Sequence, residues 1–134
     1  MPFKPLFSLC LSTALWVAVV VGGASQAQAG DATAGQSVFK KCRACHVLDS
    51  DKNRVGPSLK DVVGRTAGAA DGYKFSKAMV ASGEDGLVWT EETLIQFLES
   101  PRKVVKGTKM AFPGLRKPED RANVVAYISQ FSTQ

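Results

Sequence analysis

Histidine and cysteine are scarce in this chain of 134 residues, and that scarcity restricts the metal chemistry it can perform. There is one histidine, His46, and three cysteines, Cys10, Cys42 and Cys45. A zinc site would need four ligands, and Cys10 is the only cysteine outside the Cys42–His46 stretch. With so few cysteines, a disulfide scaffold is also excluded.

Regular alternation of apolar and polar residues is missing as well, and so are internal repeats and low-complexity tracts. Without a period-two pattern, strands are not expected, and the sequence predicts an all-α fold. The length suits one domain. The net charge of +5 is too small to favour a nucleic-acid partner.

The N-terminal segment has the features of an export signal. Lys4 gives a positive start, an uncharged run follows, and Ala27-Gln28-Ala29 forms a small-x-small cleavage site. We therefore predict a secretory signal peptide at residues 1–29 and a mature periplasmic domain at residues 30–134. Cleavage would remove Cys10 and one positive charge.

A retained membrane anchor is the alternative for this segment. Its densest apolar part, Leu9 to Val21, is short for a bilayer span, which needs about 20 residues. The weaker flanks could lengthen it, so a protein tethered by residues 6–24 stays open.

The stretch Cys42-Arg43-Ala44-Cys45-His46 carries the chemistry. Two thiols three residues apart can form thioethers to one porphyrin, and the adjoining His46 can then bind the iron, which is the pattern of c-type haem attachment. A redox Cys-x-x-Cys would favour a βαβ context, whereas the surroundings read as helix. A structural disulfide would leave His46 without a role.

Local signals predict about five helices. Asp31 or Thr33 can cap the first, Thr90 the fourth, and Pro118 can occupy the first position of the last. The expected helices run from this first cap through Cys42, near Leu59 to Val63, from Tyr73 to Ser82, from Thr90 to near Glu99, and from Pro118 through Phe131. A turn is expected at residues 83–86.

Met110 is the candidate for the second iron ligand. It lies in a loop rich in glycine and lysine, residues 106–115, with no helical apolar stripe around it. A core methionine would have such neighbours, as Met79 does in its short apolar segment. A thioether presented from a loop suits Met/His haem ligation.

With these motifs the chain resembles the class I c-type cytochromes, in particular the group of cytochrome c2 and mitochondrial cytochrome c. The resemblance extends over nearly all of residues 30–134. It rests on Cys42 to His46, Val55-Gly56-Pro57-Ser58-Leu59, Gly64-Arg65, Trp89, Gly107-Thr108-Lys109-Met110 and Ala126-Tyr127.

The resemblance implies one covalently attached haem c within a single all-α domain. It implies thioethers at Cys42 and Cys45, with His46 and Met110 as the two iron ligands. It also implies that the Pro57 carbonyl accepts the Nδ1–H of His46.

For the haem propionates, the resemblance implies bonds from Arg65 and Trp89, with Thr108 in the same region. It further implies that the first and last helices cross near Gly35 and Tyr127. From the residues alone, Gly35 could equally be only a mildly destabilising helix residue.

Three positions depart from the pattern of relatives. Phe75 stands where a propionate-bonding tyrosine is common, and Tyr73 is the candidate substitute. Phe97 stands where many relatives have a tyrosine that bonds the methionine sulfur. Met79 falls near a position that is often asparagine.

We expect an electron carrier and not an enzyme, acting as a monomer. A haem enzyme or gas sensor would need polar groups beside an open iron site, and the region before Met110 offers only Thr108 and Lys109. The expected partners present acidic docking faces: a quinol-oxidising complex, a terminal oxidase, a photosynthetic reaction centre or a periplasmic dehydrogenase. The cations expected to attract them are Lys40, Lys41, Arg43, Lys52, Arg102, Lys103, Lys106, Lys109, Arg116 and Lys117.

Overall fold

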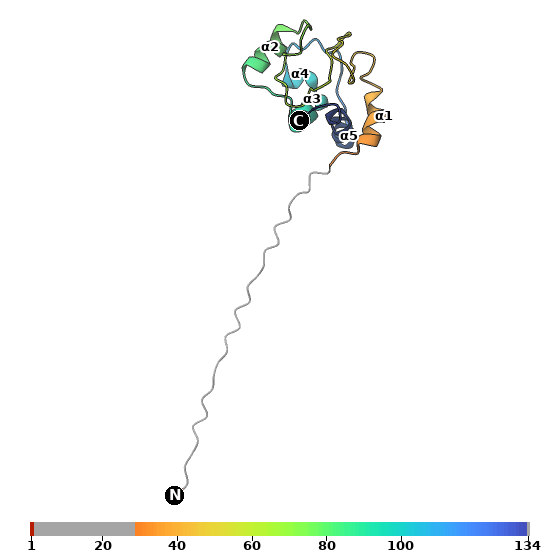
Figure 1. Ribbon diagram of the computed structural model, residues 1–134. Helices are drawn as coiled ribbons and strands as arrows, with labels where there is room; N and C mark the ends of the chain where they lie inside the picture. Colours follow the sequence, from red (N-terminus) through yellow and green to blue (C-terminus); the bar gives the residue numbers. More distant parts are fainter. Residues whose placement is uncertain (2–28, 134) are drawn as a thin grey trace.

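Five helices joined by long loops make up the structure, a computed structural model that describes residue 1 and residues 29–133 (Figure 1). The predicted signal peptide therefore lies almost wholly outside the described residues. The helices are α1 (Ala32–Phe39), α2 (Lys77–Glu84), α3 (Glu91–Glu99), α4 (Pro101–Val104) and α5 (Pro118–Ser129). In the described part of the chain the only β-pairing is an isolated bridge between Thr66 and Val88, which confirms the all-α prediction.

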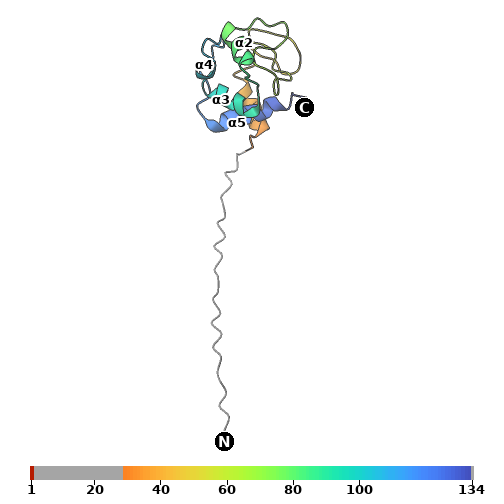
Figure 2. The ribbon, with the colours of Figure 1, turned by 90° about the vertical axis from the view of Figure 1, so that its left-hand side faces the viewer.

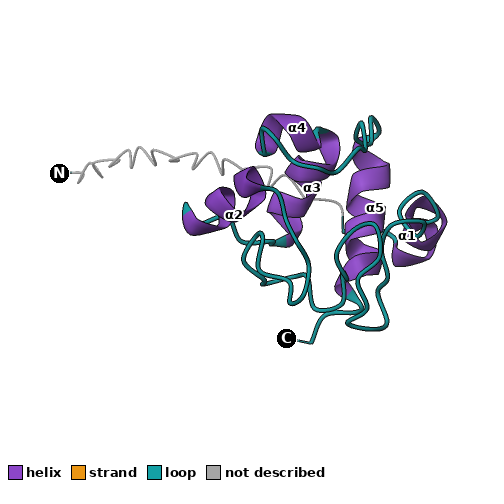
Figure 3. Ribbon diagram, turned by 90° about the horizontal axis from the view of Figure 1, so that it is seen from above, coloured by secondary structure: helices purple, strands orange, loops and turns teal. Residues whose placement is uncertain are grey.

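α1 and α5 pack directly against each other (Figures 1 and 3). Asp31 caps α1, since its carboxylate accepts hydrogen bonds from Thr33 N (2.8 Å) and Ala34 N (3.2 Å). A Cβ on Gly35 would overlap the backbone carbonyl of Asn123 and lie 2.9 Å from Tyr127 Cβ. Gly35 is therefore required by a close helix crossing, as the resemblance implies.

α3 begins as its sequence predicts. Thr90 and Thr93 form a capping box, in which each side chain bonds the other residue's backbone N–H (3.1 and 2.8 Å). Glu91 and Glu92 occupy the first turn, where the helix dipole favours negative charge. The helix ends at Glu99, just before Pro101.

α2 differs from the prediction, because it begins at Lys77 rather than near Tyr73 and extends to Glu84. Ser76 caps it, its hydroxyl accepting Met79 N at 3.1 Å. The residues before the cap are held by other contacts: the rings of Tyr73 and Phe75 meet edge to face at 4.8 Å. Gly83 and Glu84 consequently lie inside α2, and of the turn expected at residues 83–86 only residues 85 and 86 form one.

The predicted helical piece near Leu59 to Val63 is wrong. Two amides of this segment bond distant carbonyls: Leu59 N bonds Val47 O (2.8 Å) and Asp61 N bonds Phe131 O (3.0 Å). Asp61 also has a positive φ of 53°. The four-residue α4, which begins at Pro101, was not predicted. It takes the place of the missing helix, so the number of helices in the described residues is still five.

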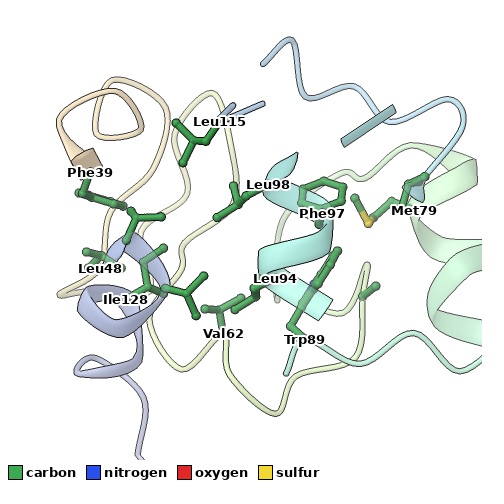
Figure 4. Packing of buried hydrophobic residues seen from close by; sticks show 14 residues of the cluster. Phe39, Leu48, Val62, Met79, Trp89, Leu94, Phe97, Leu98, Leu115 and Ile128 are labelled. Carbon is green, nitrogen blue, oxygen red and sulfur yellow. The ribbon is translucent and has the colours of Figure 1, made fainter. Parts of the chain in front are cut away.

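The buried side chains form one cluster with two ends (Figure 4). Phe39, Leu48 and Ile128 gather beside α1 and α5, whereas Met79, Trp89 and Phe97 gather beside α2 and α3. Figure 2 shows the same helices and loops from the side. None of the helices among the described residues is both long and apolar enough to span a bilayer.

Candidate haem site

A cavity of about 350 Å³ lies between these helices and the loops. Cys42, Cys45, His46 and Met110 all line it, although more than 60 positions separate Met110 from the others along the chain. Most of the remaining wall is apolar. Leu94, Leu98 and Ile128 contribute to it, together with aromatic side chains from three segments.

The Cys42–His46 stretch lies in a turn after α1, which ends at Phe39 instead of continuing through Cys42 as predicted. The N–H groups of Cys45 and His46 both donate to the Cys42 carbonyl at 3.0 Å. Both cysteines are half-buried and unpaired, so each thiol remains available. Burial raises the pKa of the Cys42 thiol, and the ammonium of Lys41 partly opposes this shift.

The orientation of His46 is set by its neighbours. Nδ1 donates to the Pro57 carbonyl at 2.7 Å, the bond that the resemblance implies, so the lone pair lies on Nε2. A Cβ on Gly56 would overlap the imidazole ring, so only glycine permits this approach. Burial lowers the pKa of His46, with the Pro57 bond opposing, and the neutral form able to bind a metal is favoured.

Met110 is half-buried in a loop that follows α4. Val105, almost fully buried, anchors the start of this loop, and Thr108 N donates to its carbonyl at 3.1 Å. The Thr108 hydroxyl accepts Met110 N at 3.3 Å. The predicted ligand thus shares the cavity with His46, and its binding to iron stays a prediction.

The four residues predicted around the propionates also line the cavity: Arg65, Tyr73, Trp89 and Thr108. Arg65 donates to the carbonyls of Ser58 (2.8 Å) and Lys60 (3.2 Å). The Tyr73 hydroxyl donates its proton to the Val55 carbonyl at 2.7 Å, so in this arrangement that proton bonds the loop. Their propionate contacts stay predictions.

Met79 contributes to the cavity in a way the sequence did not indicate. Its side chain is 8% exposed, as a core methionine's should be, yet it lines the cavity together with Phe75 and Phe97. In Figure 4 it points toward Phe97. No local pattern could have revealed this, because α2 approaches the cavity only through tertiary packing.

Phe97→Tyr should change both the redox potential and the far-red sulfur-to-iron absorption band. Phe97 is buried and shares the cavity with Met110, and its ring is tilted against that of Trp89 with the ring centroids 4.9 Å apart. A phenol placed there can donate to the thioether, a weak acceptor, and draw electron density from it. Potentiometry and far-red spectra measure the effect.

Phe131→Tyr is the matched control, since Phe131 packs on Tyr127 and is absent from the cavity wall. Identical potentials and spectra for wild type and Phe97→Tyr would show that the ring does not face Met110.

The donor set fits a covalently attached haem. Two unpaired thiols, an imidazole with a free Nε2 and a thioether face one mainly apolar cavity. Attachment of a haem through thioethers needs the two thiols, and Met/His ligation of its iron needs the imidazole and the methionine thioether.

The comparisons agree with this chemistry. The Cytochrome c family model matches residues 32–132. Cytochrome c2 of Afifella marina is 49% identical over 108 residues, covering 79% of this chain and 87% of the relative. The structure of cytochrome c2 from Rhodospirillum centenum superposes with a TM-score of 0.73 at 43% identity, covering 78% of this chain and 100% of that one. The structure of cytochrome cH from Methylobacterium extorquens superposes with a TM-score of 0.69 at 47% identity. That match covers 75% of this chain and 99% of the other. The chain therefore belongs to the cytochrome c family, whose members bind one haem c covalently and carry electrons rather than catalyse a reaction.

Proposed function

We propose that this cytochrome c is a periplasmic carrier of single electrons, exported with cleavage after Ala29. Its donors and acceptors would be respiratory or photosynthetic membrane complexes or periplasmic dehydrogenases. The observation that most supports the role of electron carrier is that His46 and Met110 line the same cavity. With both ligands on the iron, no coordination position is left for a substrate.

The bound haem supplies a one-electron iron couple, and the protein side chains make it suitable for transfer. Cys42 and Cys45 would hold the group in place, and the Pro57 carbonyl keeps the His46 ring in one tautomer. Phe97, Leu94 and Leu98 exclude water from the buried wall. A carrier needs such rigidity because nothing should move when the iron changes valence.

Docking is the second part of the proposal, and it depends on the cations named above, here called the basic rim. Every member of the basic rim is exposed. Two of them, Lys41 and Lys109, line the cavity itself, beside the apolar Val55, which is 76% exposed. The ion pairs among the described residues are Lys60–Asp51 and Arg121–Glu99, so the basic rim keeps its charge available for a partner.

Reversal of a charge in the basic rim should slow association with the partner. We expect Lys41→Glu to lower the association rate by about tenfold at low salt, because steering by opposite charges raises encounter rates by at least that factor. The effect should fade at higher ionic strength, where the Debye length falls to about 8–10 Å. Stopped-flow oxidation by a purified terminal oxidase, over a salt series, measures it.

Lys74→Glu is the control, since Lys74 is exposed but outside the basic rim. Equal salt slopes for wild type, Lys41→Glu and Lys74→Glu would rule out electrostatic steering. The apolar edge at Val55 and Ala111 would then be the docking determinant.

Export is tested separately. The mass of the purified haem protein should correspond to residues 30–134 plus one haem. A mass that includes residues 1–29 would contradict cleavage and support the tethered form.

A further inference from the structure

Arg121 is an unusual residue for its place in the fold. It lies in the first turn of α5, where the helix dipole disfavours positive charge, and it is only 8% exposed. Its Nε has no hydrogen-bond partner among the described residues. Its one ion-pair partner among the described residues, Glu99, is 3.8 Å from Nη2 and mostly exposed, so it compensates little.

The hydrogen bonds that Arg121 donates explain why a buried charge is kept at this position. Nη1 donates to the carbonyls of Leu115 (2.7 Å) and Arg116 (3.1 Å), in the segment that joins Met110 to α5. This segment has no helical hydrogen bonds of its own. A guanidinium can serve two adjacent carbonyls from one position, whereas a lysine ammonium is a single, more flexible donor.

α3 holds the same segment from the other side. Leu115 N donates to the Leu98 carbonyl at 2.7 Å, and the Leu115 side chain is buried. At Gly114, φ is 104° and a Cβ would overlap the Glu99 carbonyl, so the chain lies directly on the end of α3. Leu115 is thereby attached at its N–H to α3 and at its carbonyl to α5.

Met110 therefore lies between two fixed points. Val105 and Thr108 fix the chain before it, and Leu115 fixes the chain five residues after it. Without Arg121, the carbonyls of Leu115 and Arg116 would lose this donor, and the stretch of chain around Met110 that lacks an anchor would extend toward Lys117. Detachment of the Met110 sulfur would then require less disruption.

We propose that Arg121 is a positioning residue that keeps the Met110 thioether on the iron. This inference rests on the proposed role of Met110 as a ligand. Arg121 is not among the residues that line the cavity, and it would act through the backbone of Leu115 and Arg116.

The test measures competition for the iron in the ferric holoprotein. Imidazole is titrated into Arg121→Lys while the far-red band is followed, and thermal unfolding is recorded by circular dichroism. We expect imidazole affinity to rise about tenfold, in line with the loss of one hydrogen bond from a charged donor. Gly114→Ala should displace the same segment while Arg121 is intact, so it should also raise the imidazole affinity. It replaces Arg121→Lys as the test variant if Arg121→Lys does not fold.

Asn123→Ala is the matched control for general destabilisation. Asn123 is also a buried polar residue of α5, but its Oδ1 accepts Asp31 N (2.7 Å) at the α1 side. Its imidazole affinity should stay at the wild-type value even where its unfolding temperature falls. Equal affinities in wild type, Arg121→Lys and Gly114→Ala, or an equal rise in Asn123→Ala, would overturn the inference alone. Absence of the far-red band in the wild type would overturn the Met110 assignment, and this inference with it.

Discussion

Met110→Ala should retain its haem, lose the far-red sulfur-to-iron band and bind carbon monoxide in the ferrous state. The thioethers come from Cys42 and Cys45, so attachment does not depend on the sixth ligand. An alanine has no donor atom, and the thioether raises the potential by favouring the reduced iron, so we also expect a lower potential. Absorption spectra with and without carbon monoxide, and potentiometry, measure these changes.

Met79→Ala is the necessary control for this experiment, because its thioether lines the same cavity. We expect Met79→Ala to keep the far-red band and to exclude carbon monoxide, at some loss of stability from the buried space it leaves. If Met110→Ala kept its potential and excluded carbon monoxide while Met79→Ala lost the band, Met79 would be the ligand instead.

Gly35→Val should destabilise the holoprotein by about 3 kcal/mol, or roughly 15 °C in unfolding temperature. Even a Cβ at this position would overlap the Asn123 carbonyl, so α1 and α5 would have to separate. The haem-attachment turn follows α1 directly, and the separation would therefore loosen it too. Thermal unfolding of the reduced protein by circular dichroism measures the loss.

Ser37→Val places the same side chain on an exposed position of α1. Its expected effect is limited to helix propensity, in which serine and valine differ by less than about 0.5 kcal/mol. Similar losses for the two variants would mean that the helix crossing tolerates a side chain at position 35.

Two helix starts were predicted from the side chain that supplies the cap. Asp31 and Thr90 bond backbone groups two or three residues away, so the sequence contains both partners. Pro118 at the start of α5 is an equally local signal. The start of α2 was misplaced because the contacts that keep Tyr73 and Phe75 out of the helix include a bond to Val55, eighteen residues earlier.

The amino-acid sequence alone determined the cofactor, because thiol spacing and the adjoining imidazole are properties of a few consecutive residues. It did not indicate every side chain that lines the cavity. Met79 lines the cavity together with Phe97 of α3, and the amides of Leu59 and Asp61 bond the carbonyls of Val47 and Phe131 instead of helical ones. These features depend on hydrogen bonds and packing between elements far apart in the chain, and only the tertiary structure decided them.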